Sequence, residues 1–261
     1  MWTVGVYAAL VLSAAIGLSL GLVGGGGSIV TVPLLVYVAG LPPREAVALS
    51  LPIVGATAAV GAYLHYRQGN ADLRAALVFG LTGMVGAQLG APLTRFFPAP
   101  VLMLLFAALM IGVGLRMLQS RREAETVSTG ECHPARCGVA GLGVGILTGF
   151  LGVGGGFLIV PALLRFAKIP MKEAVGTSLL IIAANSASGF VAHLGEIGQN
   201  GPLAVAFTLS ALLGLAGGTV LGRRMHPQGL KTAFAGLALV VAAYLVVMNV
   251  GPMAGLLGHR G

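Results

Sequence analysis

Two runs of glycine contain the residues best suited to chemistry. One run is Gly24–Gly27, followed by Ser28, and the other is Gly152–Gly156, interrupted only by Val153. Polyglycine favours neither helix nor strand, so each run is expected to break a helix. A helix that starts after such a break has unpaired backbone N–H groups at the positive end of its dipole, and glycine lets a ligand approach them closely. The sequence therefore predicts a small-anion site at the two breaks.

Polar side chains from neighbouring apolar segments extend the predicted anion site. Ser50 and Thr57 share one face of an apolar segment, and Ser178 and Asn185 repeat that pattern in a later segment. Polar groups within a membrane should face a cavity or another helix, and hydroxyl and amide donors suit an oxyanion. The predicted substrate-binding set is Gly24, Gly25, Gly26, Gly27, Ser28, Ser50, Thr57, Gln88, Gly154, Gly155, Gly156, Ser178 and Asn185.

Two histidines lie farther along the same stripes. His65 follows Ser50, and His193 follows Ser178, by fifteen residues, which is about 22 Å of helical rise. Near the membrane surface such side chains are either solvated residues at helix ends or titrating gates, because imidazole changes charge near neutral pH. His65 and His193 are therefore the candidates for gating or proton coupling.

Each part of the predicted anion site has a structural alternative. The glycine runs could allow close packing of helices, which is the role we infer for the Gly17-x-x-x-Gly21 motif. The four polar side chains of the two stripes could instead make hydrogen bonds between helices. The residue types alone leave both alternatives open.

The motifs typical of enzymes, cofactor sites and metal sites are weak or missing. Cys132-His133-x-x-x-Cys137 offers three potential metal ligands at loose spacing, and we expect both cysteines to be free thiols. The middle of each apolar segment lacks Asp and Glu, and the chain has no P-loop motif. The sequence therefore predicts no cofactor, no metal and no enzymatic activity.

The composition is that of a membrane protein. Of the 261 residues, 57% are hydrophobic and 8% are charged, whereas an average soluble domain has about 25% charged residues. Several apolar runs reach the roughly 20 residues that a helix needs to cross a bilayer core of about 30 Å. The net charge of +8 arises from Lys and Arg scattered between these runs, as in loops beside an anionic membrane. Soluble enzymes, nucleic-acid-binding proteins and disordered proteins are excluded.

The chain contains one unit twice, at an offset of 128 residues. Between Gly17 and His65, about 20 of 49 positions are identical to the positions 128 residues later, which indicates an internal repeat. Beyond His65 the register is expected to drift by a few residues. The expected fold is all-α, with five apolar elements in each unit. They cover residues 4–23, 28–39, 46–66, 73–93 and 101–118, then 138–151, 157–167, 174–194, 203–221 and 230–248.

Three of these elements, 28–39, 138–151 and 157–167, are short for a membrane span. With the glycine runs beside them, we expect re-entrant or half-membrane helices, because broken backbone at membrane depth must be buried in protein or line a cavity. The expected organisation is one integral membrane domain: repeat 1 over residues 1–118, a polar linker over 119–136 and repeat 2 over 137–261.

The basic residues orient the units in the membrane. If the chain changes sides after every element, 12 of the 15 Lys and Arg residues share one face, and Arg44, Arg95 and Arg260 lie on the other. The richer face is then cytoplasmic, with the linker inside and both termini outside. If the first two elements of each unit formed one broken span, the split would be about 8 to 7. Because five is odd, alternation predicts inverted repeats, which are typical of secondary transporters.

The doubled Gly-x-x-x-Gly-x-x-Gly-x-Gly-Gly-x5-Pro pattern, followed by Glu-Ala-Val and a serine, resembles the TauE/SafE sulfite exporter family. The copies begin at Gly17 and Gly145, and the resemblance extends from Gly5 to Met248. The first copy has Gly25 where the second has Val153, which leaves the glycine break intact. The resemblance implies a multi-pass protein of the bacterial inner membrane that exports sulfite or an organosulfonate.

The residues by themselves indicate only a small anion, and two other functions stay open. One is a channel or transporter for another small anion, such as a carboxylate. The other is a membrane assembly protein or membrane enzyme without transport activity. The predicted partners are a small anionic substrate and the lipid bilayer, without nucleic acid.

Overall fold

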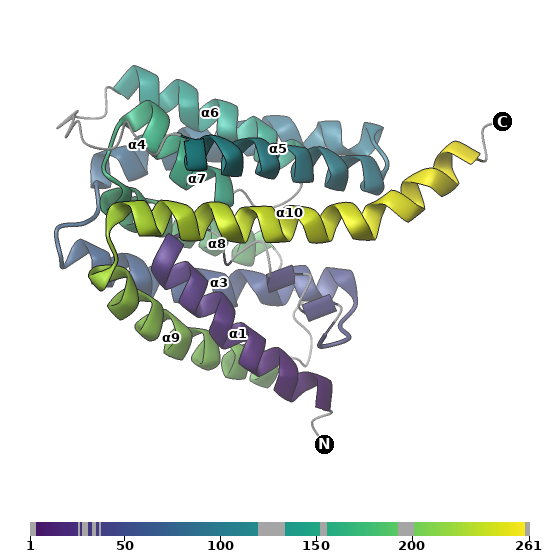
Figure 1. Cartoon of the computed structure of the whole chain (residues 1–261), viewed down its shortest axis with the longest axis horizontal. Coiled ribbons are helices and arrows are strands. Elements are labelled where there is room, and N and C mark those ends of the chain that lie inside the picture. Colours follow the sequence, from purple (N-terminus) through teal and green to yellow (C-terminus); the bar gives the residue numbers. More distant parts are fainter. Residues whose placement is uncertain are drawn as a thin grey trace.

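A computed structural model of the chain describes residues 4–25, 27, 31–32, 35–36, 38–119, 134–151, 156–192 and 201–258. These residues form helices and short connections, without a strand among them (Figure 1). The all-α class predicted from the sequence is confirmed. The helices are α1 (Val4–Val23), α3 (Pro43–Tyr66), α4 (Leu73–Gly90), the 3-10 helix η1 (Ala91–Phe96), α5 (Ala99–Gln119), α6 (Pro134–Leu151), α7 (Gly156–Ala162), the π-helix η3 (Leu163–Ala167), α8 (Met171–Ala192), α9 (Gly201–Arg224) and α10 (Pro227–Gly258).

The sixth helix differs from its expected length. α6 begins at Pro134 and has 18 residues, long enough to cross a membrane. The expectation of a short sixth element is therefore wrong. Proline lacks a backbone N–H, and it is favoured in the first turn of a helix because N–H groups there make no hydrogen bond within the helix. The helix consequently starts within the polar stretch assigned to the linker. Half of the expected element 28–39 lies outside the described residues.

Seven of the described helices are long and apolar enough to span a membrane: α3, α4, α5, α6, α8, α9 and α10. Their outer faces carry rows of large apolar side chains. On α4, Leu77, Leu81, Val85 and Leu89 are all exposed and lie four residues apart along one side of the helix. Rows of this kind suit contact with lipid, because proteins in water rarely expose so large an apolar surface. The chain is a polytopic membrane protein, as the composition predicts.

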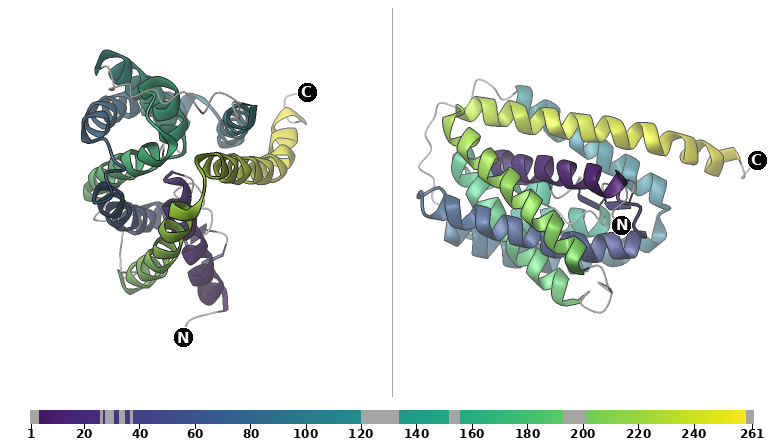
Figure 2. Two further views of the ribbon diagram at one scale, coloured as in Figure 1. Left: turned by 60° about the vertical axis from the view of Figure 1, so that its left-hand side comes forward. Right: turned by 90° about the horizontal axis from the view of Figure 1, so that it is seen from below.

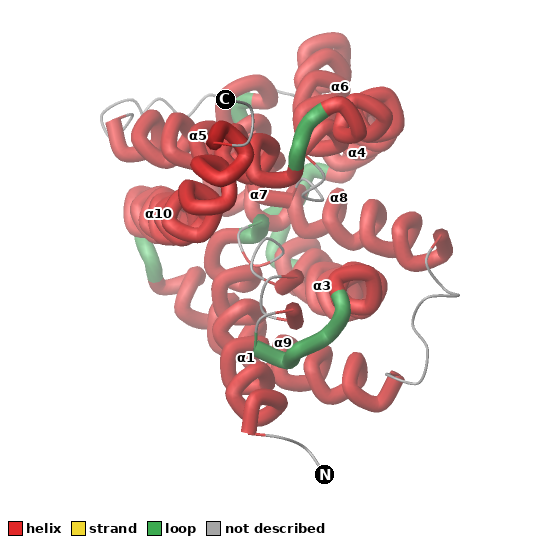
Figure 3. Tube along the Cα trace, turned by 90° about the vertical axis from the view of Figure 1, so that its right-hand side faces the viewer, coloured by secondary structure: helices red, strands yellow, loops and turns green. Residues whose placement is uncertain are grey.

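Helices of the first half pair with helices of the second half (Figure 3). α1 lies along α9, α4 along α6, α3 along α8, and α5 along α10. α3 and α8 are the most enclosed pair, with half of their apolar stretches buried. They lie between the α4–α6 pair and the α1–α9 pair, and thus form the centre of the protein.

The helix bounds repeat at the same offset as the sequence. The first residues of α3 and α8, Pro43 and Met171, are 128 positions apart. The same interval separates the starts of α4 and α9, Leu73 and Gly201, and those of α5 and α10. The drift expected beyond His65 is therefore wrong for the helix starts. Sequence identity fades there because many apolar residues serve equally well on a lipid-facing surface, whereas the helix positions persist.

Contacts along the pairs give the helix directions. Gly61 of α3 packs against Leu179 of α8, and Gly189 of α8 packs against Leu51 of α3, so these two helices run antiparallel. Counterpart helices become antiparallel if the chain changes sides after every element. If the first two elements of each unit instead formed one broken span, each unit would cross the membrane an even number of times, and counterpart helices such as α3 and α8 would be parallel. The observed direction favours alternation.

The two chain ends lie toward the same end of the bundle (Figures 1 and 2). α10 extends beyond its neighbours there, with the end of α10 in yellow and the start of α1 in purple. This arrangement agrees with an even number of side changes between the termini. The cytoplasmic assignment of the opposite end stays a prediction.

The closest helix approaches depend on glycine. Gly145 of α6 lies against the backbone of Gly83 on α4, and Gly17 of α1 lies against the backbone of Ala211 on α9. A Cβ atom at either glycine would collide with that backbone. The two contacts correspond to each other at the offset of 128, because Gly83 and Ala211 are also counterparts. The packing role inferred for the Gly17-x-x-x-Gly21 motif is confirmed at Gly17.

We expect Gly145→Ala to destabilise the protein, because the new methyl group would push α6 away from α4. Overpacking of this kind costs about 1–3 kcal/mol. The measurement is the midpoint of thermal unfolding in detergent, followed by circular dichroism. Gly143→Ala is the matched control, since a Cβ at Gly143 meets nothing within 4 Å and alanine is the better helix former. Equal midpoints for the two variants would contradict the proposed role of Gly145.

Candidate functional site

α1 ends at the first glycine run. The Gly24 N–H donates a 2.9 Å hydrogen bond to the Leu20 carbonyl, and the φ angle of Gly24 is 80°. Glycine adopts this left-handed conformation without steric cost, which explains why the helix stops there. A Cβ at Gly24 would come within 2.5 Å of the Ser178 hydroxyl oxygen and 3.0 Å of the Val175 carbonyl. The end of α1 therefore lies directly against the second turn of α8.

The two glycine runs meet. The backbone of Gly25 lies against the backbone of Gly156, the first residue of α7, and a Cβ at Gly25 would collide with the Gly156 carbonyl. Gly27 is not part of this contact, because it packs back against α1 at Ile16 and Leu20. Four other members of the predicted set, Gly26, Ser28, Gly154 and Gly155, lie outside the described residues.

The polar stripes make a kind of hydrogen bond that neither sequence interpretation anticipates. The hydroxyl groups of Ser50, Thr57 and Ser178 donate to carbonyls of their own helices, at Val47, Ile53 and Val175. The donor–acceptor distances are 2.6–2.8 Å. A hydroxyl has one proton, so these groups cannot at the same time donate to an anion or to another helix. The hydroxyl bonds from α1 to α9 and back are made by Ser13 and Ser210 instead.

Ser50 and Ser178 do not share one binding shell. Gly61 packs against Leu179, next to Ser178, so Ser178 lies level with the far half of α3. Ser50 is eleven residues from Gly61, about 16 Å of helical rise. Of the two serines, only Ser178 is next to a described glycine of the break. The antiparallel crossing of α3 and α8 separates them, which the sequence offset alone does not reveal.

The remaining predicted residues are distributed differently. Asn185 is near the crossing of α3 and α8, where Gly55 packs against the neighbouring Ser186. Its Oδ1 atom is buried without a hydrogen-bond partner among the described residues. Gln88 is exposed on α4. His193 lies outside the described residues.

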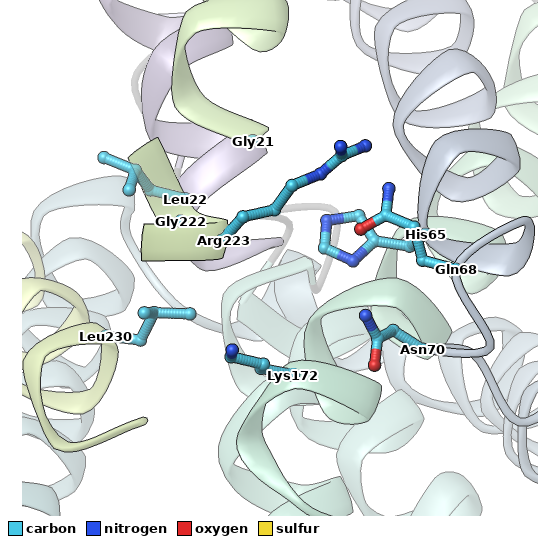
Figure 4. A pocket seen from close by; sticks show the side chains of 9 residues that line it. All are labelled: Gly21, Leu22, His65, Gln68, Asn70, Lys172, Gly222, Arg223 and Leu230. Carbon is cyan, nitrogen blue, oxygen red and sulfur yellow. The ribbon is translucent and has the colours of Figure 1, made fainter. Parts of the chain in front are cut away.

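His65 lines a pocket at the end of the bundle opposite the termini (Figure 4). This pocket, which we call the basic pocket, has an empty volume of about 370 Å³. In Figure 4 the side chains of Arg223 and Gln68 extend toward His65. The lining residues come from α1, α3, α8, α9, α10 and the turn after α3: Gly21, Leu22, His65, Gln68, Asn70, Lys172, Gly222, Arg223 and Leu230.

The basic pocket is electropositive. Lys172 and Arg223 contribute two cations, and none of its nine lining residues is acidic. Both ring nitrogens of His65 are buried and have no hydrogen-bond partner among the described residues, although the Gly21 backbone lies beside the ring. The pocket thus combines positive charge with an imidazole ring whose hydrogen-bonding capacity is unmet.

Sequence reasoning found His65 and missed the other polar residues of the basic pocket. A signal existed, however, in the repeat. Lys172 and Arg44 are counterparts at the offset of 128, and so are Arg223 and Arg95. A comparison of charged positions between the two units would have selected both lining cations.

The expectation of free thiols is wrong for Cys137, which is disulfide-bonded. Cys132 and His133 lie outside the described residues. Spacing alone did not distinguish a free thiol from a bonded one. Within the described part of the chain, no group of three or more metal-ligating side chains comes together.

The chain is similar to proteins of bacteria and archaea over most of its length. A model of the sulfite exporter TauE/SafE family matches residues 9–245. A probable membrane transporter protein of Xylella fastidiosa is 34% identical over 238 residues, which cover 88% of this chain and 91% of the relative. The probable membrane transporter protein YdhB of Bacillus subtilis is 29% identical, with 84% and 91% covered. For MJ0441 of Methanocaldococcus jannaschii, also a probable membrane transporter protein, the identity is 24%, with 91% and 94% covered.

No solved structure matches the chain. The family match includes both glycine runs and reaches every described helix. The chain is a multi-pass membrane transporter rather than an enzyme, and it belongs to the TauE/SafE sulfite exporter family.

Proposed function

We propose that this protein exports a small sulfur oxyanion, sulfite or an organosulfonate, from the cytoplasm. The substrate class is suggested by the name of the family whose model matches the chain. The observation that carries the proposed site is the meeting of Gly25 with Gly156, because two glycines there bring the end of α1 and the start of α7 into backbone contact. The binding site would lie at this junction, beside Ser178 of α8.

The electrostatics of the junction come from the helix ends. Gly156 begins α7, so the first N–H groups of that helix lack intrahelical partners and attract negative charge. The Ser178 hydroxyl, now bonded to Val175 on its own helix, would turn to the anion during binding. Asn185 is a second candidate, because its side-chain amide carries two N–H donors and lies near the crossing of α3 and α8. Its Oδ1 atom, an acceptor, has no hydrogen-bond partner among the described residues.

Alternating access would come from motion of one unit against the other. The antiparallel pairing of α3 with α8 and the common offset of the helix starts support two inverted units. In transporters with inverted repeats, such units rock around a site near the membrane midplane. Where α3 and α8 cross, Gly61 and Gly189 each pack against a leucine side chain of the other helix. Such apolar contacts suit sliding of one helix along the other.

We expect Ser178→Ala to reduce sulfite flux about tenfold or more, because loss of a donor to a charged ligand costs about 1.5–3 kcal/mol. The measurement is radiolabelled sulfite uptake into proteoliposomes at equal protein content. Thr208→Ala is the matched control: it also removes a hydroxyl bonded to its own helix, at the Ala204 carbonyl, but on α9. Unchanged flux in the Ser178 variant would remove this residue from the proposed site.

We also expect the membrane potential to drive the transport. An interior negative potential favours the exit of an anion by about 2.3 kcal/mol per charge per 100 mV. The measurement is sulfite counterflow in proteoliposomes with a potential set by potassium and valinomycin. Efflux that accelerates with inside-negative potential supports export of net charge.

The same counterflow assay tests the substrate against the alternatives. Flux of another anion that sulfite does not compete with would indicate a different substrate. A complete absence of anion flux would contradict transport of this class and favour an assembly role.

A further inference from the structure

The basic pocket lies outside the proposed glycine junction but next to it. Gly21, in its lining, is one helical turn before Gly24 at the end of α1. Lys172, also in its lining, is six residues before Ser178 on α8, or about 9 Å of helical rise. The His65 side chain lies close to Gly176, between these two positions on α8. The pocket is thus separated from the junction by little more than one turn of two helices.

We propose that the basic pocket is a vestibule that captures a small oxyanion from the water before it reaches the glycine junction. The proposal rests on the anion transport proposed above. Lys172 and Arg223 would attract the anion, and His65, Gln68 and Asn70 would replace its water with hydrogen-bond donors. The pocket is partly open to solvent, so a small anion can enter it from the water.

Charge explains why an anion is the expected occupant. Two cations that share a partly enclosed pocket repel each other, and none of the nine lining side chains neutralises them. Leu22 and Leu230 form part of the wall and lower the local dielectric, which strengthens the attraction of an anion. The closest acidic positions in sequence are Glu173 and Asp72, and neither lines the pocket.

The repeat supplies an independent argument. In the predicted orientation only three basic residues lie on the outer face, Arg44, Arg95 and Arg260. Two of them are the counterparts of the vestibule cations, since Arg44 corresponds to Lys172 and Arg95 to Arg223. An outer face with few positive charges therefore retains them at the positions that the vestibule uses on the inner face. A role in orienting the protein in the membrane would not require that correspondence.

The first test measures the local potential and does not depend on the substrate. A cysteine is introduced at Asn70 in a background with Cys132→Ser and Cys137→Ser, and the purified protein is kept in detergent. The rates of modification by a negatively charged and a positively charged methanethiosulfonate are compared. We expect the ratio of the anionic to the cationic rate to be about tenfold higher at position 70 than at a reference position, as focused potentials of several kT allow. A cysteine at the exposed Thr232 on α10 gives the reference rates.

Removal of one vestibule cation sharpens this test. Arg223→Gln should lower the ratio of anionic to cationic rates several-fold, whereas Arg224→Gln, the matched control on the next residue, should leave it unchanged. Arg224 is exposed and does not line the pocket. Equal ratios in both variants and in the parent protein would overturn the proposal, whatever the protein transports.

The second test measures transport into everted membrane vesicles, in which the predicted cytoplasmic face is outside. Arg223→Gln should raise the KM for sulfite about tenfold and change the maximal rate less than twofold, because capture weakens while the later steps remain. Arg224→Gln should keep both values. A wild-type protein that moves no sulfite would contradict the proposed function alone, since the labelling ratio still tests the vestibule.

A lipid phosphate has the same chemistry as a free oxyanion and is distinguished by reconstitution. The labelling ratio is measured in nanodiscs of neutral phosphatidylcholine and in nanodiscs with added phosphatidylglycerol. A ratio that stays the same supports a pocket for soluble anions. A ratio that collapses with the anionic lipid, together with an unchanged KM in Arg223→Gln, would identify a headgroup as the occupant and overturn the proposal.

Discussion

Close backbone contact between helices, possible only at glycine, is the constraint on which this structure depends. Lipid supplies no hydrophobic driving force between helices, so packing and hydrogen bonds must hold them together. Gly17 and Gly145 let α1 and α6 approach their partners until backbone meets backbone. The same property acts at Gly25 and Gly156, where two segments far apart in sequence come together. Helix packing and the proposed binding site thus depend on one residue type at different places.

The satisfaction of polar groups is the second constraint. In a membrane an unpaired hydroxyl is costly, and Ser50, Thr57 and Ser178 avoid this cost by bonding to their own helices. Such a bond can be exchanged for one to a ligand at little net cost. Asn185 and His65 instead keep buried polar atoms that have no hydrogen-bond partner among the described residues.

In the proposed function, the basic pocket and the glycine junction divide the task of handling an anion. Long-range attraction requires full charges, which are tolerable only near water, and these are Lys172 and Arg223 at the helix ends. Binding at membrane depth favours partial charges, which backbone N–H groups and hydroxyls provide without a buried cation. In this proposal strong attraction at the basic pocket precedes weak binding at the junction, so that the anion would enter the junction and leave it again.

The sequence by itself determined the all-α membrane class, the family, the repeat at 128 residues and the packing role of Gly17, because composition and periodicity are local properties of the chain. It predicted the bounds of α1 correctly but missed the start of α6 at Pro134. Only the tertiary structure decided that Gly25 meets Gly156, that Ser50 and Ser178 lie apart, and that His65 shares a pocket with Lys172 and Arg223. These relations depend on how antiparallel helices cross, and an offset along the chain does not fix that crossing in space.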